Sequence, residues 1–158
     1  MLLHSLLENL DQLKSISLTK GMVIGEPQYF TVRKRWFSSD DRIPDAEKNG
    51  LYLYVSENFD VWYIGKGQYK SGGGIGYRSC SHLGKSYRDQ EEMFPYHEWA
   101  KDELVEQAIR ESLSRGHFQI VTIVVEPIIF ISLLETFLQT AYKLASKNEL
   151  PPLNKRIG

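Results

Sequence analysis

The sequence predicts an α+β fold in which a small central antiparallel β-sheet is flanked by helices. Residues 50–67, GLYLYVSENFDVWYIGKG, alternate apolar side chains with others on both sides of a short polar stretch, which is typical of a β-hairpin over 51–66. Residues 119–125 are rich in β-branched side chains and predict a third strand. Apolar residues at helical spacing surround these segments, so we expect helices against the sheet.

The first 14 residues predict an amphipathic helix. Their leucines recur at helical spacing, at positions 3, 6, 7, 10 and 13. No basic stretch or small-residue cleavage site accompanies the leucines, which argues against a secretion signal. This leucine stripe could form the interface of a homodimer or higher oligomer.

The second half of the chain predicts a helix, the strand over 119–125 and a further helix. Residues 98–115 carry apolar side chains on one face, and Gly116 is expected to end this surface helix. After the strand, Pro127 is expected at the first position of a buried helix that ends near residue 147. The apolar run 120–138 is nearly long enough for a membrane span, but two glutamates and this proline interrupt it, so we expect no membrane segment.

Length and composition indicate one domain with an extension. The 158 residues are 42% hydrophobic and 12% aromatic, which suits a single core. We expect an N-terminal extension over 1–48 and a main domain over 49–158 that carries an insert at 84–97. A single cysteine excludes an internal disulfide framework, and we expect a cytoplasmic protein.

The hairpin pattern also predicts which side chains share a face of the sheet. If residues 57–60 form the loop, Ser56 lies opposite Val61, Tyr54 opposite Tyr63, and Tyr52 opposite Gly65. Strand alternation then places the tyrosines together on an open face beside the glycine-rich segment 70–76, which we expect to be a flexible loop. The opposite, core-facing side would hold Leu51, Leu53, Val55, Trp62 and Ile64.

Basic and aromatic residues gather in two segments of a chain whose net charge is −1. Residues 61–88 contain no acid, and residues 28–37, QYFTVRKRWF, place three cations between aromatics. Cations mixed with aromatics are typical of nucleic-acid-binding surfaces. A solvated basic face is the simpler alternative for 61–88, and an N-terminal strand with a basic surface is an equal alternative for 28–37. The candidate nucleic-acid-binding residues are Arg33, Lys34, Arg35, Lys66, Lys70, Lys85 and Arg88.

Gly50-Leu51-Tyr52 and Tyr63-Ile64-Gly65 resemble the two halves of the motif that names the GIY-YIG nucleases, and the spacing of 11 residues between the tyrosines matches as well. The resemblance extends over residues 49–158 and is most like the small restriction endonucleases of the family. Leu51 replaces the isoleucine of the family motif. The resemblance implies further site residues in the family's order, namely Arg78, His82, Glu135 and Asn154.

The resemblance also implies a role for each of these residues. Glu135 would bind Mg²⁺ (or Mn²⁺), because such ions take oxygen ligands and keep waters and a substrate phosphate. Tyr63 would contact the nucleophilic water, with Tyr52 orienting it; the less favoured alternative for either tyrosine alone is a packing residue. Arg78 would clamp the scissile phosphate, four residues from a histidine on the same face of a short helix.

Two of the implied residues leave alternatives open. His82 would bond a phosphate oxygen or help to move a proton, but a histidine that only packs is nearly as plausible. Asn154 would orient Glu135 or Tyr52 by hydrogen bonding, but it could also be an ordinary turn asparagine.

The function expected on this basis is that of a metal-dependent endonuclease that hydrolyses phosphodiester bonds in double-stranded DNA. Small size favours a site-specific, restriction-type enzyme that acts as a homodimer or higher oligomer. The alternatives are a repair or mobile-element nuclease selective for DNA structure, and a nucleic-acid-binding module without turnover.

Overall fold

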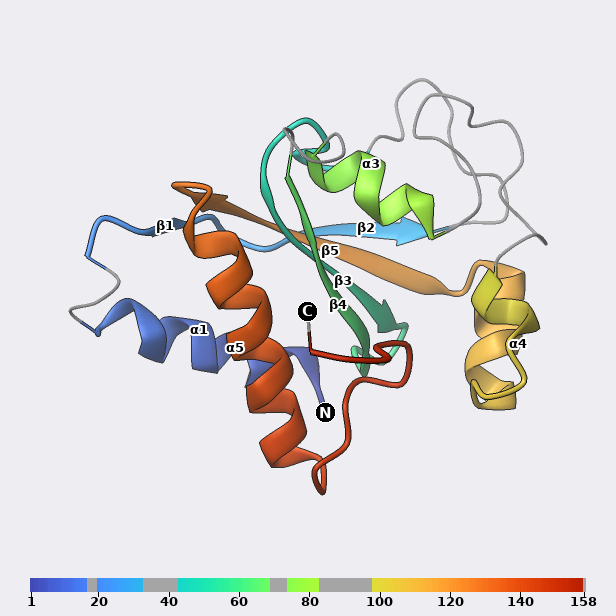
Figure 1. Ribbon diagram of the computed structural model, residues 1–158. Helices are drawn as coiled ribbons and strands as arrows, with labels where there is room; N and C mark the ends of the chain where they lie inside the picture. The colour runs from blue at the N-terminus through green and yellow to red at the C-terminus, as the bar shows by residue number, and fades with distance from the viewer. Residues whose placement is uncertain (17–19, 33–42, 69–73, 83–97, 158) are drawn as a thin grey trace.

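The computed structural model describes residues 1–16, 20–32, 43–68, 74–82 and 98–157 (Figure 1). Every strand pairing in it is antiparallel. The described elements, in chain order, are α1 (Leu3–Lys14), β1 (Val23–Ile24), β2 (Gln28–Val32), β3 (Gly50–Ser56), β4 (Val61–Gly67), α3 (Gly74–Ser81), the 3₁₀ helix η2 (Glu98–Lys101), α4 (Gln107–Arg115), β5 (Phe118–Glu126) and α5 (Phe130–Ala145).

A five-stranded sheet in the order β1-β5-β3-β4 forms the centre of the molecule, and β2 also pairs with β5. The predicted α+β class, with a small antiparallel sheet flanked by helices, is therefore confirmed. Residues 20–32 add β1 and β2 to the far edge of β5, so the N-terminal part of the chain belongs to the same sheet as the hairpin.

The hairpin register is as predicted over most of its length, with Tyr54 opposite Tyr63 and Tyr52 opposite Gly65. It differs near the loop, where a register shift follows Tyr54 and pairs Val55 with Val61. The predicted pairing of Ser56 with Val61 is therefore wrong, because one extra residue is accommodated in β4.

The extra residue is Trp62, and it corrects the predicted division of the two faces. With the bulge, Val61 joins the aliphatic side of the hairpin, whereas Trp62 packs in the core cluster that contains Tyr52 and Tyr54. Alternation without a bulge would have placed this tryptophan on the aliphatic side.

One face of the sheet is aliphatic and is covered by α1 and α5 (Figure 1). Leucines of α1 and the apolar side of α5 pack there against Leu51, Leu53 and Val55 of β3. Leu3, Leu6, Leu10 and Leu13 of α1 are all buried. The leucine stripe thus contributes to the chain's own core, which corrects the expectation that it could form an oligomer interface.

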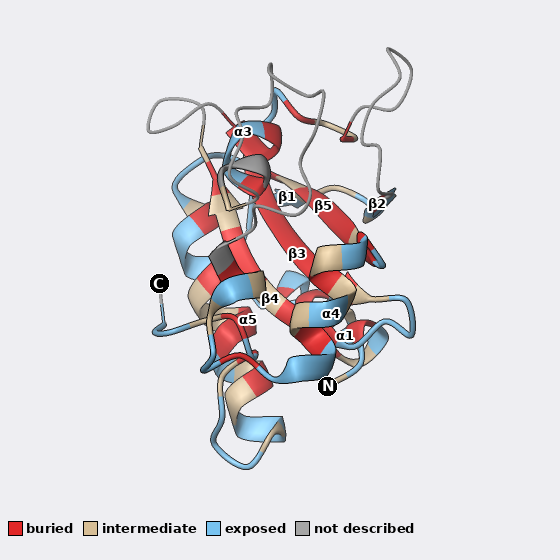
Figure 2. Cartoon of the chain, turned by 90° about the vertical axis from the view of Figure 1, so that its right-hand side faces the viewer, coloured by how far each residue is buried: buried red, intermediate tan, exposed pale blue. Residues whose placement is uncertain are grey.

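The other face of the sheet is aromatic and is covered by α3, η2 and α4. The side chains of Tyr52 and Tyr54 are 1% and 0% exposed, so the prediction of an open tyrosine face is wrong for both. Figure 2 shows the same burial along β3 and β5. Both faces of the hairpin therefore pack into a core, one aliphatic and one aromatic.

The helix boundaries follow the sequence signals with three exceptions. The predicted helix over 98–115 is wrong in its first part, because only η2 and α4 are helical and residues 102–106 between them are not. Asp102 accepts a hydrogen bond from the N–H of Leu104 there, which favours a turn.

Gly116 takes the left-handed conformation that ends α4, as predicted. In contrast, α5 begins at Phe130, after a turn that starts at Pro127, and residues 74–76 of the glycine-rich segment form the start of α3 rather than a loop. Within the described residues, we find no helix with both the length and the apolar character needed to cross a membrane.

The C-terminal tail covers the outer edge of β4. The backbone N–H of Leu153 donates to the carbonyl of Trp62 at 2.9 Å, and the Leu153 side chain is buried. β4 is the last strand of the sheet, so this contact satisfies a backbone group that the sheet leaves unpaired.

Candidate active site

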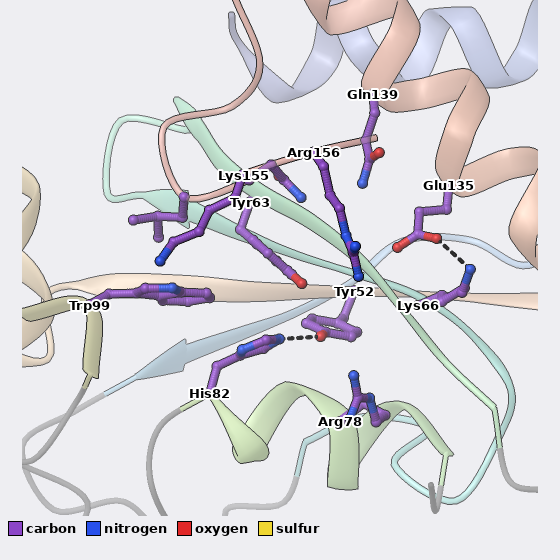
Figure 3. A pocket seen from close by; sticks show the side chains of 12 residues that line it. Tyr52, Tyr63, Lys66, Arg78, His82, Trp99, Glu135, Gln139, Lys155 and Arg156 are labelled. Carbon is purple, nitrogen blue, oxygen red and sulfur yellow. Dashed lines mark hydrogen bonds and ion pairs between the residues drawn. The ribbon is translucent and has the colours of Figure 1, made fainter. Parts of the chain in front are cut away.

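A pocket of about 460 Å³ lies at the β4 edge of the sheet, between α3, α5 and the C-terminal tail (Figure 3). All six residues that the resemblance implied for catalysis line it: Tyr52, Tyr63, Arg78, His82, Glu135 and Asn154. These residues come from β3, β4, the end of α3, α5 and the tail. The fold thus brings together side chains that are far apart in the sequence.

Two positions of the hairpin require glycine because other atoms of the protein lie where a Cβ would be. A Cβ on Gly65 would lie 2.5 Å from Cε1 of Tyr63 and 2.8 Å from Cζ of Tyr52, so the two phenol rings extend across this glycine. A Cβ on Gly50 would meet the backbone carbonyl of Ile123 in β5. The first glycine leaves room for the tyrosines, and the second lets β3 and β5 pair closely.

Tyr52 and His82 are linked at the floor of the pocket. The Tyr52 hydroxyl and His82 Nε2 share a hydrogen bond of 2.9 Å. Burial, and next the neighbouring phenol of Tyr63, raises the pKa of Tyr52 well above its usual value. Burial, and next the positive charge of Arg78, lowers the pKa of His82 to about 4. At neutral pH both groups are therefore uncharged.

Trp99 in η2 fixes the other side of this histidine. Its ring stacks on the His82 imidazole with centroids 4.7 Å apart and planes 18° apart, and it lies 5.0 Å from the Tyr63 ring. The Trp99 side chain is 4% exposed, so it keeps water from one face of the imidazole. This contact accounts for part of the burial that keeps His82 neutral.

Tyr54 shares the aromatic face but does not line the pocket. Its hydroxyl donates a hydrogen bond to the backbone carbonyl of Ser79, which ties β3 to α3. Of the three hairpin tyrosines, Tyr63 is the only one whose side chain is partly exposed. Tyr63 is therefore the tyrosine most accessible to a solvent molecule in the pocket.

Glu135 is a buried carboxylate on α5, 6% exposed. Its Oε2 lies 2.8 Å from Nζ of Lys66, but the approach does not have hydrogen-bond geometry, so this buried oxygen has an ionic contact without a hydrogen bond. A buried carboxylate is costly unless positive charge offsets its own, and Lys66 supplies part of that charge.

A divalent metal with oxygen ligands fits this position. Mg²⁺ needs only one or two carboxylates when waters and a substrate phosphate complete its coordination. Among the described residues there is no cluster of three histidine, cysteine or acidic side chains that would form an all-protein metal cage. The donor set of the pocket therefore fits an ion held by Glu135 and shared with a phosphate.

Asn154 has a different contact from the predicted one. Its Oδ1 accepts from the N–H of Ile64, and its Nδ2 donates to the carbonyl of the same residue, both at 2.9 Å. Gln139 on α5 donates to that carbonyl as well, at 3.0 Å. The expectation that Asn154 orients Glu135 or Tyr52 is therefore wrong, because the amide pairs instead with the edge of β4.

The predicted nucleic-acid-binding residues are described only in part. Lys66 lines the pocket and is paired with Glu135. The remaining ones, Arg33, Lys34, Arg35, Lys70, Lys85 and Arg88, lie outside the described residues, as does the predicted insert at 84–97.

Five lining residues were missed by reasoning from the sequence: Trp99, Gln139, Leu153, Lys155 and Arg156. Gln139 lies one helical turn after Glu135, and the two cations directly follow Asn154, so their spacing could have indicated them. Nothing in the sequence around Trp99 indicates its position.

Among the described residues, the charges of the pocket are mostly positive. Lys66, Arg78, Lys155 and Arg156 line it together with one carboxylate, Glu135. A polar, cationic pocket with a single buried carboxylate suits an anionic ligand that shares a divalent cation with the protein.

We compared the chain with known proteins to ask whether the resemblance of the two tyrosine motifs extends to any of them. A scan against protein-family models found no match, and searches of curated proteins and of solved structures found no match either.

Proposed function

We propose that the protein is a metal-dependent endonuclease that hydrolyses phosphodiester bonds in double-stranded DNA. The observation that carries this proposal is that Tyr52, Tyr63, Arg78, His82, Glu135 and Asn154 all line one cationic pocket. Hydrolysis of a phosphodiester needs a positioned water, stabilisation of charge on the phosphorus oxygens and a route for a proton. The pocket offers a side chain for each need.

Tyr63 is proposed to contact the attacking water. It is the partly exposed phenol in the pocket, whereas Tyr52 is buried and its raised pKa keeps it protonated. A protonated phenol that is bonded to a neutral imidazole can orient its neighbour but is a poor base. We therefore assign the water contact to Tyr63 and the orienting role to Tyr52.

Arg78 is proposed to bind the phosphate that is cleaved. A guanidinium on the last turn of α3 matches the two oxygens of a phosphodiester with parallel hydrogen bonds. His82 Nε2 is already engaged by the Tyr52 hydroxyl, which favours the proton-moving role of this histidine over direct contact with a phosphate oxygen. Because the pKa of His82 is lowered to about 4 and that of Tyr52 is raised, a proton that His82 accepts would come from a more acidic donor than Tyr52.

Glu135 is proposed to hold Mg²⁺ or Mn²⁺, which would supply Lewis-acid stabilisation of the phosphate oxygens and a more acidic bound water. The Lys66 ammonium contacts Glu135 in the structure. With DNA bound, this ammonium could contact the phosphate instead.

We propose a restriction-type, site-specific enzyme over two alternatives, a structure-selective repair or mobile-element nuclease and a binding module without turnover. Binding alone does not require a buried carboxylate in a cationic pocket, which argues against the binding module.

Cutting both strands needs two correctly spaced pockets, so we propose that the protein acts as a dimer or higher oligomer. The single cysteine suits a cytoplasmic location.

Plasmid cleavage tests the proposal. Supercoiled DNA is incubated with the protein in Mg²⁺, in Mn²⁺ and in EDTA, and the products are separated on a gel. We expect discrete bands with either metal and intact plasmid in EDTA. A smear would favour structure-selective or non-specific cutting. Binding without any cutting would contradict the enzyme and favour the binding module.

A further inference from the structure

The segment that follows Asn154 is held in place by the edge of β4. The Leu153 N–H donates to the carbonyl of Trp62, and both ends of the Asn154 amide bond the backbone of Ile64. The Asn154 N–H also donates to the carbonyl of Pro151 at 2.8 Å, which closes a turn. The backbone before Lys155 is thus fixed against the sheet, so the two cations that follow start from a defined place at the pocket.

Lys155 and Arg156 differ in how their charges are satisfied. Lys155 Nζ lies 3.5 Å from a carboxylate oxygen of Asp102, an ion pair in which the lysine side chain is largely exposed. Among the residues that the structure describes, none forms a hydrogen bond or ion pair with Arg156. A guanidinium that has no such partner among the described residues and lies at a polar pocket favours an anionic ligand with two or more oxygens.

Arg156 and Arg78 approach the pocket from different elements. In Figure 3 Arg78 extends from α3 and Arg156 from the tail, with Tyr52 between them in the view. One guanidinium is enough to bind the phosphate that is cleaved. The DNA strand carries further phosphates on either side of it. A strand of DNA that lies in the pocket would therefore bring another phosphodiester group to the tail.

We infer that Lys155 and Arg156 form a phosphate-binding segment that holds the substrate strand beside the cleaved bond. The inference rests on the proposed function, because it assumes that the pocket binds DNA. Arg156 makes the main contact, since Lys155 already has an ionic partner in Asp102. Contacts of this kind position the strand without reading its sequence.

The test is equilibrium binding of a fluorescent DNA duplex in EDTA, so that no strand is cut, measured over a range of salt concentrations. Arg156→Ala is compared with the unmodified protein, with Arg156→Lys and with Arg115→Ala. Arg115 is an exposed cation of α4 that lies away from this pocket, so its removal changes the net charge equally.

We expect Arg156→Ala to weaken binding about tenfold and to lower the slope of log K against log salt by about 0.9, the value for one lost phosphate contact. Arg156→Lys should keep the slope but bind more weakly than the unmodified protein, because a lysine keeps the charge and loses the forked geometry. Arg115→Ala should change neither quantity by a comparable amount.

Two failures are distinguishable. If the unmodified protein binds no DNA, the inference is overturned, and the proposed function is contradicted with it only if plasmid cleavage in Mg²⁺ also fails. If the unmodified protein binds DNA but Arg156→Ala behaves like Arg115→Ala, the inference alone is overturned and the proposed function stands. Because Arg156 is exposed, we expect Arg156→Ala to fold normally, so a loss of binding would not result from misfolding. Circular dichroism of the variant checks this.

Discussion

Both faces of the hairpin are largely buried, but they differ in composition. The face toward α1 and α5 contains aliphatic side chains, whereas the cluster on the face toward α3 and η2 contains three tyrosines, two tryptophans and two phenylalanines. Aliphatic side chains bring no hydrogen-bonding groups, so the first face contributes apolar burial alone. Phenols bring apolar area together with hydroxyls, so the second face can build a core and a polar pocket from the same residues.

The difference shows that one strand can serve two purposes through alternation. In β3, Leu51 and Leu53 point to the aliphatic core, while Tyr52 between them reaches the pocket. Substitutions on the aliphatic face should therefore change stability, and those at the pocket should change the reaction. Variants on each face test that separation.

Glu135→Gln should reduce the rate of single-turnover cleavage by about 10³-fold, because it removes the charge that holds the metal. The side chain keeps its size and the helix keeps its propensity, so the thermal unfolding of the variant should stay close to that of the unmodified protein. Rates are measured across a Mg²⁺ titration, with Glu8→Gln on the exposed side of α1 as the matched control. Cleavage by Glu135→Gln at the unmodified rate would contradict the metal role.

Leu6→Ala should lower the free energy of unfolding by about 3 kcal/mol, because Leu6 is fully buried in the aliphatic core and leaves a cavity. The cleavage rate per folded molecule should not change. Urea denaturation measures the stability, and Leu144→Ala, at a leucine that is 79% exposed on α5, is the control. A large loss of activity in a fully folded Leu6→Ala protein would show that the two faces are not separable.

Tyr63→Phe should slow cleavage by about 10²-fold without changing the concentration of Mg²⁺ needed for half-maximal rate. Tyr54→Phe removes the same group from the same face, but the lost hydrogen bond to Ser79 lies away from the pocket. It should cost about 1 kcal/mol of stability and leave the rate unchanged. Equal rate losses for both variants would assign Tyr63 to packing rather than to the reaction.

His82 should make the fold sensitive to acid. Its pKa of about 4 in the folded chain lies below the ordinary value of 6.5, so the unfolded chain binds more protons between these two values. The contribution of His82 is therefore fully present above about pH 6.5 and is lost as the pH falls toward 4, by at most about 1.4 kcal/mol per pH unit.

Trp99→Ala should raise the pKa of His82 toward its ordinary value by exposing the imidazole, and it should flatten this pH dependence. Trp99→Phe keeps an aromatic ring over the imidazole, so the pKa of His82 should stay closer to its value in the unmodified protein. The groups that face the imidazole are Tyr52, Tyr54, Tyr63, Arg78 and Trp99. NMR titration of the histidine ring protons measures each pKa, and an unchanged value in Trp99→Ala would refute the role of the stack.

Much of the fold follows from local pattern. The strand over 119–125, the hairpin arms and the glycine stop after α4 are set by side-chain alternation and by the left-handed glycine, which are properties of neighbouring residues. The bulge that turns Trp62 to the aromatic face is different, because it depends on how the loop joins the strands. A pattern that assumes strict alternation cannot include it.

The residues of the site could be predicted from the sequence where they belong to a motif. Their partners could not be predicted where tertiary contacts determine them. The six implied residues do line one pocket, but Asn154 pairs with a strand edge that no local signal marks as its partner. Trp99 meets His82 across 17 positions of sequence, through contacts that only the folded chain defines. For the same reason, the pairing of Lys66 with Glu135 could not be read from the basic segment that contains this lysine.

The amide of Asn154 that closes the edge of β4 lies 90 residues after the backbone group it bonds. During synthesis on the ribosome the hairpin therefore emerges long before the segment that completes its outer edge. The partners of Ile64 in α5 and in the tail come late as well. A nascent chain whose hairpin has left the ribosome cannot yet assemble the pocket. Any nuclease activity would therefore begin only after the turn that contains Asn154 has also emerged and packed against β4.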